Sequence, residues 1–134
     1  MVLLVRDFMT RKKEVVSSND SVISAIELMV ENDVGSVVVV DDDRVVGIFT
    51  ERDLLRRYLQ GQSKLLYMTV AEVMSTPVIT IKPDDKLSDA FKIMGERNIR
   101  HLPVVDDDGG LVGYLTWKDM FKFVSQRLGS DELE

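Results

Sequence analysis

The chain of 134 residues contains two copies of one sequence, and this duplication limits the folds it can adopt. Residues 5–10 align with residues 70–75, an offset of 65, and the same offset carries the Val-Val-Asp-Asp-Asp run at 39–43 onto 104–108. One extra residue in the second copy then shifts the offset to 66 for the rest of the repeat. Because a repeat of this kind encodes one supersecondary unit, we expect two copies of a single small fold.

Each copy predicts the order strand, helix, strand, strand, helix, which gives an α+β fold of two βαββα repeats. The strands are β-branched runs, and the helices carry apolar residues at three- and four-residue steps on one face, Val22, Ala25, Ile26 and Met29 in the first copy and Leu87, Ala90, Phe91 and Met94 in the second. The expected elements are strands 15–16, 35–40 and 45–49 with helices near 22–29 and at 51–59, then strands 78–81, 100–105 and 111–115 with helices near 87–94 and at 117–128.

The polar stretch at 60–64 is typical of a linker, so we place the first repeat at 1–62 and the second at 63–134. A unit of about 60 residues buries too little surface to be well stabilised alone. We therefore expect the two repeats to pack sheet against sheet about a pseudo-twofold axis.

Composition narrows the functional classes. The absence of cysteine excludes a disulfide framework, a thiolate nucleophile and a cysteine-rich zinc site, and it fits a reducing compartment, so we expect the cytoplasm. No stretch approaches the roughly 20 apolar residues that cross a bilayer. The net charge of −6 argues against a nucleic-acid-binding protein, because such proteins usually carry a basic surplus.

The segments at 47–53 and 113–119 both have the form Gly-x-x-Thr-x-x-Asp at a predicted strand-to-helix junction. A threonine followed three residues later by an acid is close to a capping box, which would account for the motif without a ligand. The same junction could also bind one, since a helix N-terminus can receive a phosphate and a carboxylate can accept hydrogen bonds from ribose hydroxyls. Both readings are compatible.

These features together resemble a pair of cystathionine-β-synthase-type (CBS) domains. The resemblance covers residues 5 to about 124 and includes the strand Arg-His-Leu-Pro-Val-Val-Asp at 100–106, in which the two basic residues stand in reversed order relative to the family. It implies that Asp53 and Asp119 hold a ribose, and that Thr50 and Thr116 reach phosphate. The candidate ligand-binding residues are Thr10, Ile48, Thr50, Arg52, Asp53, Ser75, Val78, Ile79, Ile99, Arg100, His101, Tyr114, Thr116, Lys118 and Asp119.

Several of these residues have an alternative interpretation. His101 is the only histidine and fits either a phosphate contact or a polar residue at a pocket edge, and Arg52 and Lys118 fit either a phosphate contact or a solvated helix face. The triple Asp runs lack the spacing of a calcium-binding loop and are typical of solvated turns. We therefore expect no metal site. Trp117, Tyr114 and the methionines at 9, 29, 74, 94 and 120 are expected in core or dimer packing.

No nucleophile, base and orienting group can be assembled from the sequence, so we expect no enzyme and no catalytic cofactor. The resemblance implies a regulatory module that binds AMP, ADP, ATP or S-adenosylmethionine in the cleft between the repeats, with Val78, Ile79 and Ile99 against the base. It also implies a homodimer and a regulated partner protein that the sequence does not identify. The alternative is an interaction module with degenerate or empty ligand sites.

Overall fold

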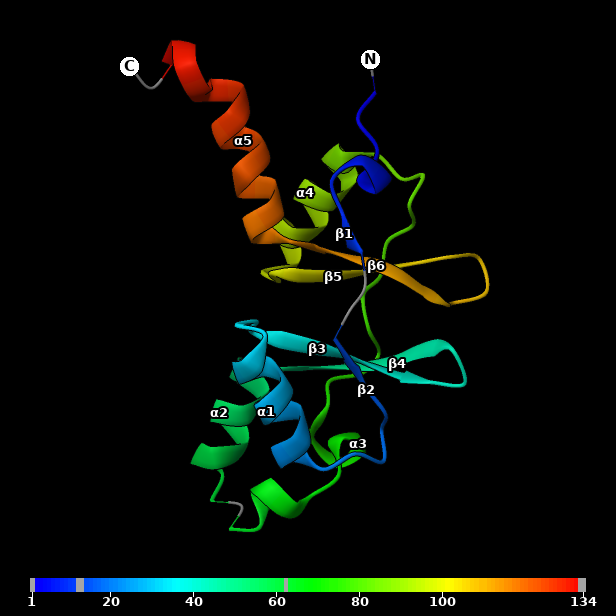
Figure 1. Cartoon of the computed structure of the whole chain (residues 1–134), viewed down its shortest axis with the longest axis vertical. Coiled ribbons are helices and arrows are strands. Elements are labelled where there is room, and N and C mark those ends of the chain that lie inside the picture. Colours follow the sequence, from blue (N-terminus) through cyan, green and yellow to red (C-terminus); the bar gives the residue numbers. More distant parts are fainter. Residues whose placement is uncertain (1, 12–13, 62, 133–134) are drawn as a thin grey trace. The chain divides into compact units, whose positions relative to one another are not determined.

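The computed structural model describes residues 2–11, 14–61 and 63–132, with side chains described up to residue 128. The chain divides into two compact units (Figure 1). Unit 1 consists of Met1–Lys12, Ile79–Asp108 and Val112–Glu134, and unit 2 of Lys13–Val78 and Gly109–Leu111. The mixed α+β class predicted from the sequence is confirmed.

Unit 2 contains a three-stranded sheet in the order β2-β3-β4. β2 (Val15–Val16) runs parallel to β3 (Ser36–Asp41), which pairs antiparallel with β4 (Arg44–Thr50). α1 (Val22–Glu31) and α2 (Glu51–Leu59) lie on one face of this sheet, and the chain continues through a 3-10 turn at Leu65–Tyr67 into α3 (Val70–Val73) (Figure 1). The buried core joins both layers through Val22, Ala25, Met29, Val37, Val39, Phe49, Val70 and Val73.

Unit 1 has a similar two-layer architecture, but its third strand pairs antiparallel with the second strand of the hairpin and not parallel with the first. Its sheet has the order β1-β6-β5, built from β1 (Thr10–Arg11), β5 (His101–Val105) and β6 (Leu111–Thr116). α4 (Leu87–Arg97) and α5 (Trp117–Glu132) cover one face of it (Figure 1). The core is formed by Val5, Ile81, Leu87, Ala90, Met94, Leu102, Val104, Leu115 and Met120.

The two units are not the two halves of the sequence. β1 comes from the first copy but pairs antiparallel with β6 of the second, through Thr10 with Tyr114 and Arg11 with Gly113. In the same way α3 begins the second copy but packs into the core of unit 2. Each unit is therefore completed by the opening segment of the other repeat. The repeat boundary at 62–63 and the packing of the repeats about a pseudo-twofold axis stay predictions, and Gln62 itself lies outside the described residues.

The strand predicted at 78–81 is wrong for most of its length. Only Ile81 pairs, as a single parallel bridge to Val104, which is the counterpart of the pairing of Val16 with Val39 in unit 2. Ile81 receives an N–H bond from Val105 and donates to the carbonyl of Pro103. The next bond along a parallel ladder would need an N–H from Pro103, and proline has none.

The helices follow the predicted pattern, and on the two predicted apolar faces Phe91 is the exception. α2 has the predicted bounds, because the Thr50 hydroxyl accepts the Asp53 N–H and so begins the helix. Phe91 was expected on the buried face of α4 but is exposed. The equivalent residue of α1, Ile26, is half-buried. Among the described residues, no helix is both long and apolar enough to cross a membrane.

Candidate functional site

Asp53 is held in place by the residues that cap α2. Its Oδ2 accepts hydrogen bonds from the Thr50 N–H at 2.9 Å and the Thr50 hydroxyl at 3.1 Å, and its own N–H donates back to Thr50 Oγ1 at 3.1 Å. Its Oδ1 accepts a bond of 2.8 Å from the Ser75 hydroxyl. The residue is only 8% exposed. An ionised carboxylate has about four acceptor positions, so about one remains for a ligand.

Asp119 has equivalent hydrogen-bond partners in unit 1, but its bond to the distant hydroxyl is longer. Oδ2 accepts from the Thr116 N–H at 2.9 Å and the Thr116 hydroxyl at 3.0 Å. Oδ1 accepts from the Thr10 hydroxyl at 3.3 Å. Asp119 is half-buried, so its carboxylate is more accessible than that of Asp53. The sequence-predicted groups Thr50, Asp53 and Ser75, and Thr10, Thr116 and Asp119, therefore form two equivalent clusters.

Hydrogen bonds at the start of α2 and α5 engage most of the backbone N–H groups that the sequence predicts to face a phosphate. The N–H of Glu51 donates to the carbonyl of Gly35 at 3.0 Å, and that of Trp117 donates to the carbonyl of Arg100 at 2.9 Å. Together with the Thr50 and Asp53 bonds, this engages three of the four N–H groups from Thr50 to Asp53. A phosphate at this position would therefore depend on side chains more than on the helix N-terminus.

The glycine of each motif allows the opposite segment to approach closely. A Cβ on Gly113 would lie 2.7 Å from the backbone oxygen of Thr10, and one on Gly47 would collide with the side chain of Met74. The approach is fixed in unit 2 by backbone bonds in both directions between Ile48 and Ser75, at 3.2 and 2.8 Å. Glycine at these positions thus places the Ser75 and Thr10 hydroxyls beside their carboxylates.

The other candidate residues lie outside the two clusters, in both units. Ile79 and Ile99 are half-buried against the core of unit 1, whereas Val78 belongs to unit 2. His101 begins β5 and is half-buried, Tyr114 pairs with Thr10 across the sheet, and Ile48 pairs with Ser75. Arg52, Arg100 and Lys118 are exposed.

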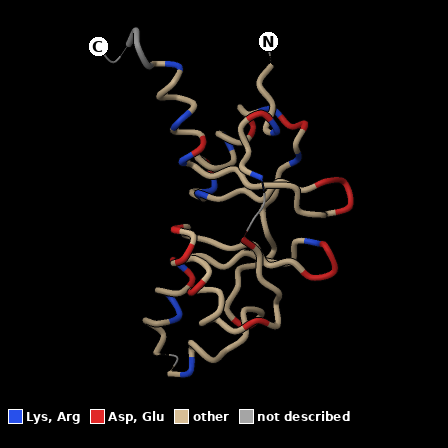
Figure 2. The backbone as a smooth tube through the Cα atoms, viewed as in Figure 1, with Lys and Arg blue, Asp and Glu red and all other residues tan. Residues whose placement is uncertain are grey.

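The acidic hairpins behave as turns. Figure 2 shows acidic residues gathered at the tips of the β3–β4 and β5–β6 hairpins. Asp42 and Asp43 have positive φ angles, which Asp adopts more readily than most residues. Within the described residues no group of three or more His, Cys, Asp or Glu side chains is arranged to hold a metal ion.

One carboxylate at the base of a hairpin has a structural role. Oδ1 of Asp41 accepts hydrogen bonds from the Ser18 N–H and the Ser17 hydroxyl, both at 3.1 Å. Hydrogen bonding from Ser18, followed by that from Ser17, lowers the pKa of Asp41 below its usual value. These bonds fix the segment between β2 and α1 to the end of β3.

Sequence reasoning missed a groove of about 440 Å³ on the helical face of unit 1. It is lined by Phe91, Met94, Gly95, Asn98, Ile99, Arg100, Trp117, Met120, Phe121 and Val124. Trp117, expected in core or dimer packing, is 50% exposed here, while Met29, Met94 and Met120 are buried as expected. The signal was present in the sequence as the apolar spacing of 117, 121, 124 and 128, but it could not be distinguished from a buried face.

The chain was compared with known proteins. The family model of the CBS domain matches residues 5–60 and 70–126. The chain is 37% identical over 117 residues to the CBS domain-containing protein YhcV of Bacillus subtilis, covering 87% of this chain and 81% of that protein. It spans 53% and 33% of the lengths of two other curated relatives.

Two solved structures are similar over nearly the whole chain. The CBS domain pair of protein MJ0100, in complex with 5′-methylthioadenosine and S-adenosyl-L-methionine, has a TM-score of 0.86 at 26% identity and covers 95% of this chain and 99% of that one. CBSX2 in complex with AMP has a TM-score of 0.82 at 34% identity and covers 93% and 98%. The repeat, the fold of each unit and the two Thr-Asp clusters agree with these matches, and the chain belongs to the CBS domain family, of which it carries a tandem pair.

Proposed function

We propose that the chain is a non-catalytic regulatory module that binds an adenine nucleotide or another adenosyl compound at its Thr-Asp clusters. Asp53 and Asp119 would accept the ribose hydroxyls, and Thr50 and Thr116 would lie beside the phosphate. Arg100, His101, Arg52 and Lys118 are the side chains available for anionic groups, while Val78, Ile79 and Ile99 offer apolar contact for the base.

The observation that supports this most directly is the repeated geometry of the two carboxylates. Each is fixed by a threonine three residues earlier and by a hydroxyl from a distant segment, Ser75 or Thr10. Capping alone explains the threonine contacts but needs no third residue. In addition, two structurally similar proteins were solved in complex with such ligands, one with AMP and one with 5′-methylthioadenosine and S-adenosyl-L-methionine.

Calorimetric titration of the full chain with AMP, ADP, ATP and S-adenosylmethionine tests the proposal. Hydrogen bonds to a charged carboxylate contribute about 1.5 to 3 kcal/mol, so Asp53→Asn and Asp119→Asn should each weaken binding at their own cluster about tenfold to a hundredfold. Asn keeps an oxygen that can cap the helix. Asp33→Asn is the matched control, because Asp33 is exposed at a positive φ that Asn also adopts.

A thermal-shift experiment separates this function from its alternative. A ligand at 100 times its dissociation constant should add about 2.7 kcal/mol to the free energy of unfolding. If none of the four compounds shifts the unfolding temperature, or if both Asp variants bind like the control, the ligand-binding function is wrong. The interaction module without a ligand would then be the better description.

The module would act in the cytoplasm as a sensor of adenylate energy state, and it would pass its signal to a separate regulated protein. It would also form a homodimer, for which the exposed apolar residues on α2 and α5 are the supporting observation. The mass of small molecules released from denatured protein would identify the ligand.

A further inference from the structure

We propose that the two Thr-Asp clusters bind different adenosyl ligands. The cluster of Asp119 takes a phosphorylated nucleotide, and the cluster of Asp53 takes an adenosyl compound without a phosphate. Arg100 and Glu51 are the residues that set this difference. The inference rests on the ligand-binding function proposed above and assigns a ligand class to each cluster.

The start of α5, which carries Asp119, is surrounded by cationic residues. The N–H of Trp117 donates to the carbonyl of Arg100 at 2.9 Å, so the backbone of Arg100 lies at the first residue of the helix. Arg100 and Trp117 are both exposed and line the same groove. Lys118 follows as the next residue of α5 and is exposed as well. Unit 1 therefore has two cationic side chains beside the helix turn that contains its carboxylate.

The equivalent place in unit 2 holds a carboxylate. The N–H of Glu51 donates to the carbonyl of Gly35 at 3.0 Å, so Gly35 has the position in unit 2 that Arg100 has in unit 1. A Cβ on Gly35 would lie 3.1 Å from Oε1 of Glu51. The Glu51 carboxylate therefore occupies the space into which a side chain at position 35 would extend.

These substitutions between the repeats change the charge at the helix start. The four equivalent positions are Arg100, His101, Trp117 and Lys118 in unit 1, and Gly35, Ser36, Glu51 and Arg52 in unit 2. With histidine neutral, the first set carries two positive charges, whereas the second carries one positive and one negative charge. A phosphate group carries a charge of about −1.5 to −2 at neutral pH. It is therefore attracted in unit 1 and meets no net charge in unit 2.

Side-chain charge decides the preference because the backbone donors are engaged in the same way in both units. In unit 2 the N–H groups of Thr50, Glu51 and Asp53 already donate hydrogen bonds. In unit 1 those of the equivalent residues do the same. The helix N-terminus thus offers each phosphate the same limited attraction, and the difference between the clusters comes from the charged side chains.

Calorimetry with AMP and adenosine on the full chain measures the difference. Asp53→Asn leaves the Asp119 cluster intact, and Asp119→Asn leaves the Asp53 cluster intact. The two ligands share base and ribose, so the ratio of their dissociation constants reports the phosphate alone and cancels the competition of Ser75 or Thr10 with the ribose. The preference for AMP over adenosine should be at least about tenfold greater in Asp53→Asn than in Asp119→Asn.

Two further substitutions assign the effect to the named residues. Glu51→Gln, added to Asp119→Asn, should strengthen AMP binding about threefold to tenfold, because a negative charge is removed beside the phosphate. Arg100→Gln, added to Asp53→Asn, should weaken AMP binding by a similar factor. Adenosine binding should not change in either case. Raising the salt concentration should reduce both effects, since the side chains are exposed.

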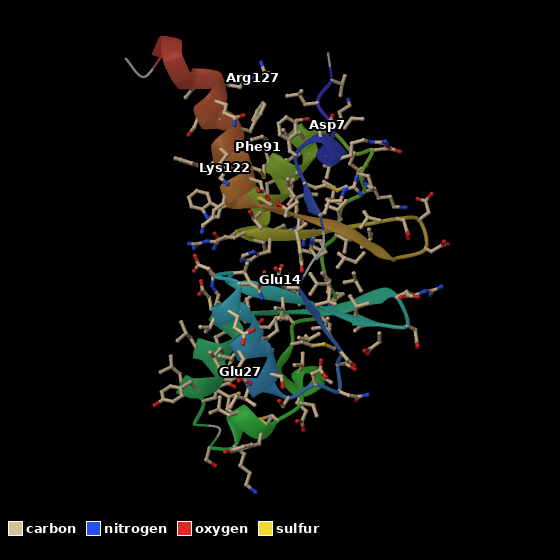
Figure 3. The ribbon with its side chains drawn as sticks, in the orientation of Figure 1. Asp7, Glu14, Glu27, Phe91, Lys122 and Arg127 are labelled. Atoms are coloured by element: carbon tan, nitrogen blue, oxygen red, sulfur yellow. The ribbon has the colours of Figure 1, made fainter. Side chains whose placement is uncertain are left out.

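The controls remove the same charges at a distance from the helix starts. Glu27→Gln changes an exposed residue of α1 and Arg127→Gln an exposed residue of α5, both labelled in Figure 3. Arg127 is ten residues from Trp117 along α5. This is about 15 Å of helix, compared with a screening length of about 8 Å at physiological salt. Neither control should alter the ratio of AMP to adenosine affinity.

The preference should also be transferable. Gly35→Arg together with Glu51→Gln gives unit 2 the cation of unit 1 and removes its anion. Both changes are needed, because an arginine beside Glu51 would pair with that carboxylate and not with a phosphate. In the Asp119→Asn chain this pair of changes should raise the preference for AMP to about that of the Asp119 cluster.

The outcomes separate this inference from the function on which it rests. If the wild type binds neither AMP nor adenosine, both are wrong. If it binds them, but with the same AMP preference in Asp53→Asn and Asp119→Asn, only the assignment of ligand classes is wrong. If the preferences differ and neither Glu51→Gln nor Arg100→Gln changes them, these two residues do not set the difference, which contradicts the inference as stated.

Discussion

The Ser75 hydroxyl donates a 2.8 Å hydrogen bond to Oδ1 of Asp53, whereas the equivalent Thr10 hydroxyl lies 3.3 Å from Oδ1 of Asp119. Asp53 is nearly closed to solvent, whereas Asp119 is half-buried. A ribose that binds Asp53 must therefore compete with Ser75, while one that binds Asp119 meets a weaker competitor. The two clusters have the same arrangement of residues and differ in how strongly the second hydroxyl binds Oδ1 of the aspartate.

Ser75→Ala should lower the free energy of unfolding by about 1 to 3 kcal/mol, because it leaves a buried carboxylate oxygen without its partner. Thr10→Ala is the matched variant and should cost less, since its bond is longer and water can reach Asp119. Urea unfolding of both variants measures the difference. Equal losses would contradict the unequal strength of the two contacts.

Gly113→Ala should destabilise the chain by about 1 to 3 kcal/mol, because the added methyl group would meet the backbone oxygen of Thr10 and displace β1. Gly95→Ala is the control. A Cβ there has nothing within 4 Å, and alanine in a helix interior is favoured over glycine by about 0.5 to 1 kcal/mol. Thermal unfolding should therefore shift in opposite directions for the two variants.

Because the pKa of Asp41 is lowered, the free energy of unfolding should depend on pH in a specific way. Its hydrogen bonds to Ser18 and Ser17 stabilise the charged form in the folded state, so their contribution is present above the unfolded pKa of 3.8 and is lost as pH falls through the lower folded pKa. Asp41→Asn should lower stability at neutral pH. The gap to wild type should narrow below about pH 4 in urea titrations. A gap that is constant with pH would show that Asp41 does not titrate as described.

Trp117 is the only tryptophan and is half exposed beside Phe121, with ring centroids 5.9 Å apart. If the exposed apolar residues of α5 are covered in the homodimer proposed above, the Trp117 fluorescence should shift to shorter wavelength as concentration rises. Val124→Asp, which places a charge among these residues, should keep the unshifted spectrum over the same range. A spectrum that does not change while the mass doubles would place the contact elsewhere.

Much of the fold could be predicted because it is locally encoded. The bounds of α2 follow from Thr50 and Asp53, which meet within one turn, and the hairpins follow from β-branched runs separated by acidic turns. β1 could not be predicted in this way. Two residues show no periodicity, and their partners at 113 and 114 are about a hundred positions further along the chain.

The same distinction applies to the candidate site. The Thr-Asp pairs are three residues apart and were predicted with their geometry, and the repeat placed Ser75 and Thr10 in equivalent positions. The loss of the strand at 78–81 depended on Pro103 in a different strand, and the exposure of Phe91 and Trp117 depended on how the helices are covered. Such properties come from tertiary neighbours, which a single sequence does not reveal.

The exchange of opening segments between the repeats has a consequence for synthesis on the ribosome. Unit 2 draws almost all of its residues from Lys13–Val78, so most of its core can close before β6 is made. Unit 1 needs Thr10 to meet Tyr114, so its sheet cannot form until residue 114 has emerged. β1 is thus synthesised about a hundred residues before its partner strand, and during that interval it is available to any competing chain.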